Sequence, residues 1–145
     1  MRIIPFDEKY RDDMIFMILQ AKDTLGHVPR LNGDLLDIRA NYLDKGDMFW
    51  LALDDEDRVI GSVGYSSIDG TCEVWLHRFY VKANMKRRGI GSALYLTAEE
   101  HMRKAGKTCV RVHMGGEGYD ASHLFYGRFG FEYYDGREYM KKELK

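Results

Sequence analysis

A glycine-containing turn with basic flanks is the segment of this chain best suited to chemistry on a phosphorylated ligand. It reads Lys86-Arg87-Arg88-Gly89-Ile90-Gly91-Ser92 and lies between a strand-like run and an amphipathic helix. Two glycines let the backbone turn tightly and bring its N–H groups close to a ligand. The helix that follows adds free N–H groups and the positive end of its dipole. The segment therefore predicts binding of a pyrophosphate in a nucleotide-like carrier.

Two better-known phosphate motifs do not occur at this turn. It has neither the Gly-Lys-Ser/Thr ending of a P-loop nor the third glycine and acid-ended strand of dinucleotide-binding folds. A lone Gly-x-Gly also occurs in ordinary strand-to-helix turns, and Lys-Arg-Arg in solvated charge runs. The rest of the chain therefore has to decide what the turn binds.

Length and composition predict a single globular domain over residues 1–145. The chain is 45% hydrophobic and 31% charged, and it is long enough to bury a core. No apolar run is long enough to span a bilayer and the start lacks a signal-peptide pattern, so we expect a cytoplasmic protein without a membrane partner. Cys72 and Cys109 are too few for a disulfide framework, and both are expected to be buried within strands. No His or Cys spacing resembles a metal site.

Charge is unevenly distributed along the chain although its net value is only −1. The first part is acidic and ends in the run Asp54-Asp55-Glu56-Asp57, whereas the middle, residues 82–111, is rich in Lys and Arg. One interpretation is a basic cofactor side and an acidic substrate side that attracts a cation, and the alternative is solvated faces. The net charge and the lack of interleaved aromatics near residues 82–88 argue against a nucleic-acid partner.

Hydrophobic periodicity predicts a mixed sheet with helices on both faces, an α/β (α+β) fold. The expected helices are Tyr10–Leu25, Leu35–Leu43 with Asn32 or Asp34 as its cap, Ile90–Lys104 and Ala121–Phe129. The expected strands are Met1–Phe6, Met48–Leu53, Arg58–Ser66, Cys72–Val81, Thr108–Met114, Phe131–Tyr134 and Glu138–Leu144.

Three segments of the chain have the order and spacing of a known family. The strand Leu76-His77-Arg78-Phe79-Tyr80-Val81 is followed, five residues on, by the turn Lys86-Arg87-Arg88-Gly89-Ile90-Gly91, and later by Phe125-Tyr126-Gly127-Arg128-Phe129-Gly130-Phe131. They resemble the fourth strand, the Gln/Arg-x-x-Gly-x-Gly/Ala turn and the Phe-Tyr-x-x-x-Gly-Phe segment of the GNAT superfamily of acyl-CoA-dependent N-acyltransferases. The resemblance covers nearly the whole chain and departs from the commonest pattern at Lys86.

The resemblance implies a central, mostly antiparallel seven-stranded sheet that splays between strands four and five. It also implies acetyl-CoA as co-substrate, with no metal. Its pyrophosphate would lie on the main chain from Arg87 to Ser92, and its pantetheine arm would pair like an extra strand with Phe79 and Val81. Tyr119 stands where the family often has an arm-contacting Asn. The implied cofactor-binding residues are Phe79, Tyr80, Val81, Lys86, Arg87, Arg88, Gly89, Ile90, Gly91, Ser92, Ser122 and Phe125.

Direct attack of an amine on a thioester needs three kinds of help. The amine must lose a proton, the carbonyl oxygen needs a hydrogen-bond donor, and the departing thiolate must be protonated. The resemblance assigns the donor to a main-chain N–H near Val81 and the acid to Tyr126. A phenol with a pKa of ~10 can protonate a departing thiolate, since the pKa of the thiol is similar or a little lower.

The sequence leaves the base open. Glu73 and His77 share one face with the other odd-numbered residues of the strand up to 81, if the strand is regular. Trp75 stands where relatives often have a glutamate base, and His113 on the neighbouring strand is a weaker candidate. Either Glu73 or His77 can act directly or through water. The remaining alternative is that the neutral amine is taken from solution without any protein base.

The resemblance places the amine acceptor between the loop Leu25–Gly33 and the final hairpin, Tyr133–Tyr139. The acceptor is a small-molecule or peptide amine: a small amine, a polyamine, an amino acid or a protein amine. We expect a monomer or a homodimer. The alternative function is a non-catalytic acyl-CoA-binding sensor or partner module on the same fold. Candidates to line an aromatic acceptor pocket, each with plain core packing as the alternative, are Tyr133, Tyr134, Tyr139, Trp50 and Trp75.

Overall fold

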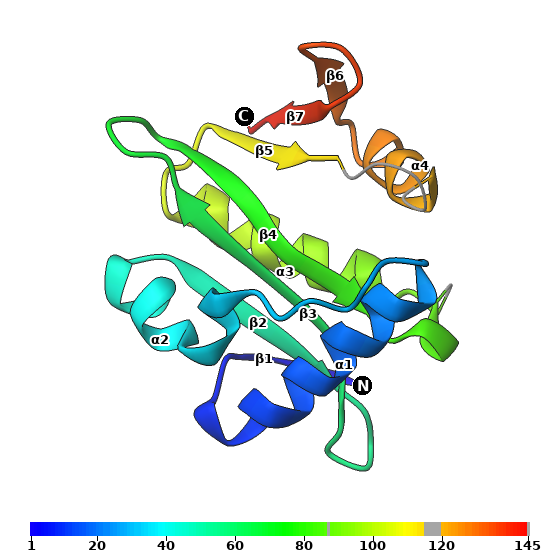
Figure 1. Cartoon of the computed structure of the whole chain (residues 1–145). Helices are drawn as coiled ribbons and strands as arrows, with labels where there is room; N and C mark the ends of the chain where they lie inside the picture. The colour runs from blue at the N-terminus through cyan, green and yellow to red at the C-terminus, as the bar shows by residue number, and fades with distance from the viewer. Residues whose placement is uncertain (87, 115–119, 145) are drawn as a thin grey trace.

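A computed structural model describes residues 1–86, 88–114 and 120–144, apart from the side chains of residues 120 and 121. Among these residues the strands form one sheet in the order β1-β2-β3-β4-β5-β7-β6 (Figure 1). In chain order the elements are β1 (Arg2–Pro5), η1 (Glu8–Tyr10), α1 (Arg11–Thr24), η2 (Gly33–Leu36), α2 (Ile38–Asn41), η3 (Leu43–Lys45), β2 (Met48–Leu53), β3 (Val59–Ser67), β4 (Glu73–Val81), η4 (Ala83–Met85), α3 (Ile90–Lys104), β5 (Cys109–His113), α4 (Asp120–Arg128), β6 (Glu132–Tyr134) and β7 (Tyr139–Glu143).

The seven-stranded sheet is antiparallel except where β4 meets β5. That parallel ladder has three pairs, from Glu73 with Cys109 to Trp75 with Arg111. β4 nevertheless continues to Val81, and Figure 1 shows β5 diverging from it along this stretch. The predicted sheet, mostly antiparallel and splayed between its fourth and fifth strands, is confirmed.

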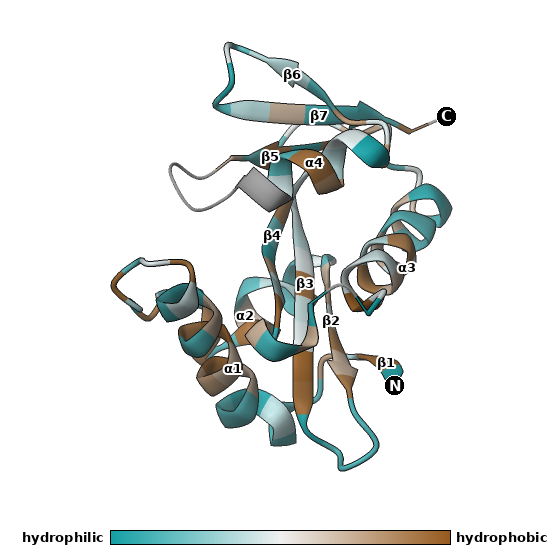
Figure 2. Cartoon of the chain, turned by 90° about the vertical axis from the view of Figure 1, so that its right-hand side faces the viewer, coloured by the Kyte–Doolittle hydropathy of each residue, from teal (hydrophilic) through white to brown (hydrophobic). Residues whose placement is uncertain are grey.

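Helices pack on both faces of the sheet, but those on the α1 side cover only part of their face. Figure 2 shows α1 and α2 on one side of the sheet and α3 on the other. The buried cluster on the α3 side draws on β2 to β5, on α4 and on β7. The cluster on the α1 side draws its strand residues from β1 to β4, and none of its described members comes from β5, β6 or β7. The α1-side face of β5, β7 and β6 is therefore without a helix among the described elements.

A β-bulge at Arg78 interrupts the regular alternation of β4. Gly64 pairs with His77, whereas Ser62, two residues earlier on β3, pairs with Tyr80, three residues later on β4. The backbone of Arg78 is left-handed, with φ of +52°. Its carbonyl oxygen accepts a hydrogen bond from Ser62 Oγ at 2.7 Å. β4 thus carries one extra residue at this point.

The bulge places His77 and Phe79 on opposite faces of the sheet. The ring of His77 meets Tyr42 on the α1 side, at a centroid distance of 6.4 Å. Phe79 and Val81 pack against the cluster on the α3 side. The expectation that the odd-numbered residues from 73 to 81 share one face is therefore wrong beyond 77, because one inserted residue shifts a period of two by one step.

The predicted helix Leu35–Leu43 is also wrong. The segment is divided among η2, the one-turn helix α2 and η3. Asp37, with φ of −147°, interrupts the helical backbone, and its carboxylate caps α2 by accepting a hydrogen bond from Ala40 N–H at 3.0 Å. Of the two expected capping residues, Asn32 occupies the N-cap position of η2 but makes no side-chain cap bond, and Asp34 lies within that turn. A carboxylate that bonds its own local backbone favours such a break.

The two cysteines differ in their surroundings. Cys109 is buried in β5, as expected, but Cys72 is exposed in the turn before β4, so its predicted burial within a strand is wrong. Within the described parts of the chain, no group of three or more His, Cys, Asp or Glu side chains is arranged to hold a metal ion. No helix among the described residues is long and apolar enough to cross a membrane.

Candidate functional site

The glycine turn leads directly into the N-terminus of α3. Gly89 precedes the helix with φ of +80°, a conformation that favours glycine. A hydrogen bond from Ala93 N–H to the Gly89 carbonyl (3.0 Å) closes the first helical turn. The N–H groups of residues 90–92 have no acceptor within the helix, and they lie at the positive end of its dipole. This geometry suits an anion such as a phosphate.

Basic side chains stand beside this turn. Lys86 and Arg88 are both exposed, and Arg88 Nη1 lies 3.4 Å from Met85 Sδ. Two positive charges next to a helix N-terminus increase the attraction for an anionic ligand. Arg87 and Tyr119 lie outside the described residues.

Gly91 lies where α3, β4 and α4 meet. A Cβ at this position would lie 3.6 Å from Phe125 Cε2, 3.6 Å from Val81 Cγ2 and 3.7 Å from Phe79 Cζ. The rings of Phe79 and Phe125 are in edge contact, with centroids 5.4 Å apart. Ser122, on α4, is half-buried. Gly91 thus lies within van der Waals reach of Phe79, Val81 and Phe125, which the family resemblance assigns to the cofactor.

The main chain of β4 presents hydrogen-bonding groups toward the splay. Lys82 N–H donates to the Ile60 carbonyl of β3 at 2.9 Å. Successive residues of a strand direct these groups to alternate sides, so those of Tyr80 face β3 and those of Phe79 and Val81 face the splay. The Tyr80 side chain packs against the cluster on the α1 side. An extended ligand can therefore form hydrogen bonds with the main chain of Phe79 and Val81, whereas the main-chain groups of Tyr80 face β3.

Tyr126 of α4 lies beside the same part of β4. Its ring centroid is 6.2 Å from that of Phe79 and 5.0 Å from that of Phe131, and 6% of the residue is exposed. Burial, with a smaller contribution from Tyr80, raises the pKa of the Tyr126 phenol. The phenol is therefore protonated at neutral pH, as a proton donor must be.

His77 lies on the other side of β4. Its Nδ1 is 3.2 Å from Ser66 Oγ. Burial lowers the pKa of the imidazole, and the neighbouring Arg78 guanidinium lowers it further, while the carboxylates of Asp34 and Asp47 act in the opposite direction. The neutral form is thus favoured at neutral pH, and a neutral imidazole can accept a proton.

The structure does not bring Glu73 next to His77. Glu73 belongs to the first β4–β5 pair, and four residues of extended strand, about 13 Å, separate it from His77. Its carboxylate accepts a hydrogen bond from Arg111 Nε at 2.7 Å, and this ion pair lowers the pKa of Glu73. His113 is exposed, with Nε2 3.4 Å from Glu138 Oε1. Of these candidate bases, His77 is the one beside the bulge.

Comparison with known proteins gives the family. The sequence profile of the acetyltransferase (GNAT) family matches residues 13–131. The chain belongs to this family. No curated protein gave a significant match.

Solved structures with the same fold include several GNAT enzymes. A GNAT-family acetyltransferase from Staphylococcus aureus Mu50 superimposes with a TM-score of 0.89 at 21% identity, over 99% of both chains. The PaiA N-acetyltransferase of Thermoplasma acidophilum, solved with coenzyme A, gives 0.76 at 22% identity over 99% of this chain and 100% of that one. A phosphinothricin acetyltransferase of Sinorhizobium meliloti, solved with acetyl-CoA, gives 0.75 at 17% identity over 99% and 88%. These likenesses show a shared fold.

The aromatic residues expected to line a GNAT acceptor pocket lie on two faces of the sheet. Trp75, Tyr134 and Tyr139 share the α1-side face, and the ring centroids of Trp75 and Tyr134 lie 5.8 and 5.5 Å from that of Tyr139. The hydroxyl of Tyr133 instead contacts α4, on the other face. Trp50 is buried in the cluster under α3. The expected set of five is therefore split, and three of them form one surface.

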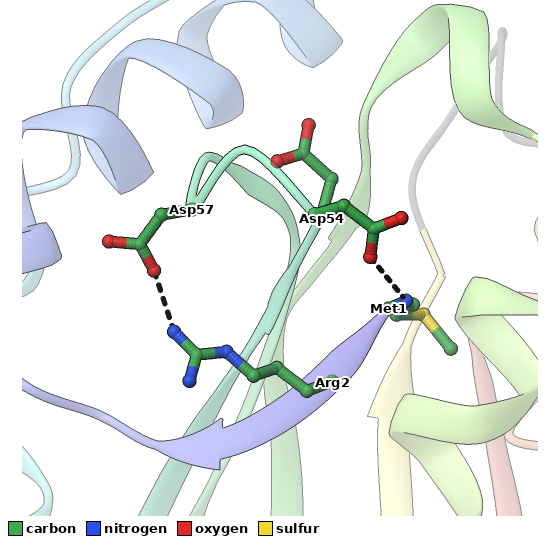
Figure 3. Close-up of a pocket in the computed structure, with 5 residues that line it drawn as sticks. Met1, Arg2, Asp54 and Asp57 are labelled. Carbon is green, nitrogen blue, oxygen red and sulfur yellow. Dashed lines mark hydrogen bonds and ion pairs between the residues drawn. The ribbon is translucent and has the colours of Figure 1, made fainter.

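Three residues of the acidic run, Asp54, Asp55 and Asp57, line a separate pocket at the β1 edge of the GNAT sheet (Figure 3). There Arg2 Nη2 lies 2.6 Å from Asp57 Oδ1, and the N-terminal ammonium of Met1 lies 3.5 Å from Asp55 Oδ1. β2 and β3 stand between β1 and β4 in the sheet. The acidic run is thus partly neutralised and does not border the splay.

Arg78 is a residue near the splay to which the sequence analysis gave no role. It stands between His77 and Phe79 and forms an ion pair with Asp34, with Nη2 and Oδ1 2.9 Å apart. Arg78 is the one permanently charged residue within the run Leu76–Val81. That charge in the otherwise apolar and aromatic run Leu76–Val81 is the sequence signal that could have identified Arg78.

Proposed function

We propose that this GNAT chain is an N-acetyltransferase that moves an acetyl group from acetyl-CoA to a primary amine by direct attack in a ternary complex. The observation that carries the proposal is the splay of β4 from β5 beside the N-terminus of α3. It puts anion-binding N–H groups next to a strand edge that can pair with an extended arm. The coenzyme A and acetyl-CoA bound in the Thermoplasma and Sinorhizobium structures support the choice of donor.

The residues around the splay fit an acyl-CoA. The N–H groups of residues 90–92, in the turn that runs from Lys86 through Arg87 to Ser92, would hold the pyrophosphate, with Arg88 beside it. The main chains of Phe79 and Val81 would bind the pantetheine arm, and Gly91, Ser122 and Phe125 would border it. Tyr80 would act indirectly, by fixing β4 against β3. Acetyl-CoA supplies the thioester that the amine attacks.

Acid and base would stand on opposite sides of β4. His77 would take a proton from the amine, directly or through one water, as the C–N bond forms. The N–H near Val81 would stabilise the carbonyl oxygen. Tyr126 would give its proton to the sulfur as the C–S bond breaks. We assign the base to His77 rather than Glu73, because the Glu73 carboxylate is held by Arg111.

Calorimetric titration with acetyl-CoA, with free adenosine diphosphate as the comparison ligand, tests the donor. We expect micromolar or tighter binding that requires the pantetheine arm, because the diphosphate lacks the contacts with β4. A panel of primary amines, scored by thiol release, then tests transfer. Equal affinity for the two ligands would contradict the donor assignment. Tight acetyl-CoA binding without thiol release from any amine would favour a non-catalytic acyl-CoA-binding module.

A further inference from the structure

A half-buried cluster of charges lies on the α1 side of β4, next to His77. Arg78 donates from Nε and from Nη2 to the two carboxylate oxygens of Asp34, each at 2.9 Å. The Tyr42 hydroxyl donates to the same carboxylate at 2.6 Å. Asp34 belongs to the segment between α1 and α2, which crosses in front of β4 in Figure 1. Arg78 and Tyr42 thus already occupy the Asp34 carboxylate.

Lys22 adds a second positive charge to this cluster. Its ammonium donates to the Arg30 carbonyl at 2.8 Å and to the Asn32 side-chain oxygen, which are both neutral acceptors. The residue is 9% exposed. Burial and the Arg78 guanidinium lower the pKa of Lys22, and Asp34 opposes them more weakly. Two cations therefore lie near one carboxylate, that of Asp34, in a partly desolvated place.

A second carboxylate near His77 does not remove this excess of positive charge. Asp47 is buried and accepts hydrogen bonds from Ser67, from its N–H at 3.1 Å and from its hydroxyl at 2.5 Å. Among the described residues, no carboxylate lies in ion-pair contact with the ammonium of Lys22, and Asp34 is the one in contact with Arg78. A buried cation that lacks a counter-charge is costly, and an added anion would offset that cost.

We propose that Arg78 and Lys22 bind the carboxylate of the acceptor, so that the chain acetylates a free amino acid rather than a polyamine. The inference rests on the proposed acetyl transfer. Arg78 uses one edge of its guanidinium on Asp34, and 27% of its side chain is exposed, which leaves the Nη1 edge for a second carboxylate. Arg78 follows His77 directly in β4, and its guanidinium lowers the pKa of the imidazole, so an acceptor carboxylate on Arg78 would lie near the proposed base. A polycation would be repelled here.

Matched acceptors test the proposal. Each pair is an amino acid and its decarboxylated amine, such as phenylalanine and 2-phenylethylamine, or lysine and cadaverine, compared by kcat/KM with acetyl-CoA fixed. We expect at least a tenfold preference for the carboxylated member. Lys22→Met should reduce that ratio at least tenfold, Lys22→Arg should largely restore it, and the exposed control Lys104→Met should not change it. A ratio near one in the wild type, or an unchanged ratio in Lys22→Met, would overturn the proposal.

A binding measurement separates this proposal from the proposed function. Lysine labelled with ¹³C at Cε reports the ionisation of Lys22 by NMR, with its signal assigned through Lys22→Met. N-acetylglycine, a carboxylate probe, should raise the pKa of Lys22, and the neutral N-acetylglycinamide should not. This readout needs no turnover, so failure of acetyl transfer defeats the proposed function alone. Identical responses to the two probes defeat carboxylate binding even if transfer to amines is observed.

Discussion

Gly89→Asp tests the proposed phosphate-binding role of the glycine turn most directly, because it places a negative charge where the proposed function places a pyrophosphate. Gly89 has φ of +80°, and a Cβ built there meets no heavy atom within 4 Å. The substitution therefore causes backbone strain but no clash. Asp tolerates the left-handed region better than most residues, at a cost of about 1 kcal/mol relative to glycine. The fold should survive, with a fall in Tm of roughly 2–4 °C.

The effect on acetyl-CoA binding follows from the added charge. A carboxylate about 5 Å from a phosphate charge, at an effective dielectric constant of about 40–80 for this exposed turn, repels it by about 1–2 kcal/mol. For the two charges of a pyrophosphate the sum is about 2–3 kcal/mol, which weakens the dissociation constant roughly 30- to 150-fold. The loss should shrink at high salt, because exposed charges are screened.

Two control variants separate charge from strain. Gly89→Asn has nearly the same shape and backbone tolerance without the charge, so it should lose stability as Gly89→Asp does but retain much more affinity. Gly106→Asp adds the same charge at the other end of α3, where φ is +78° and a Cβ again has no neighbour within 4 Å. It should lower Tm and leave acetyl-CoA binding unchanged. Calorimetric affinities within threefold of wild type for Gly89→Asp would refute the assignment of the turn.

Three further substitutions address other parts of the site and core. Tyr126→Phe should lower kcat roughly 100-fold while leaving the calorimetric affinity for acetyl-CoA within about twofold, and equal turnover would remove its role as acid. His77→Gln should abolish the acidic limb of the pH profile of kcat/KM. In the wild type this limb should lie below pH 6.5, the ordinary pKa of histidine, because burial lowers the pKa of His77. An acidic limb that is unchanged in the variant would exclude His77 as the base. In Gly64→Ala the new Cβ would lie 2.4 Å from Phe49 Cδ2, so thermal denaturation should show a loss of about 1–3 kcal/mol, and an unchanged Tm would contradict the packing.

Local sequence signals predicted most of the sheet and the glycine turn before α3. Periodicity and glycine positions placed α3 at Ile90–Lys104 as observed, because its apolar side and the flanking Gly89 and Gly106 are local features. The splay of β4 from β5 was expected from the family resemblance alone. The break of the predicted helix Leu35–Leu43 was not predictable from local pattern because Asp37 is compatible with either a helix interior or a cap.

The arrangement around β4 was not predictable from local pattern. A left-handed backbone at a non-glycine residue such as Arg78 is uncommon, and no residue type in the strand predicts it. The bulge is held by contacts with Ser62 and Asp34, which lie 16 and 44 residues away in the chain. The positive charge of Lys22 beside Arg78 likewise depends on how α1 packs over β4. Such long-range contacts decide which face each candidate residue occupies, and the alternation of residues along a strand does not predict them.

The bulge also explains how the proposed reaction can keep its two proton transfers apart. In a regular strand His77 and Phe79 would share a face, and the base would stand beside Tyr126, free to exchange protons with the acid. With one extra residue, His77 lies on the α1 side and Tyr126 on the α3 side, so in the proposed reaction the amine would enter and the thiolate would leave on opposite sides of β4. Arg78 both forms the bulge and binds Asp34, so replacing it would disturb geometry and charge together. Lys22 contributes charge without belonging to β4, so its substitution leaves the residues of the bulge themselves unchanged, and Lys22→Arg restores the charge.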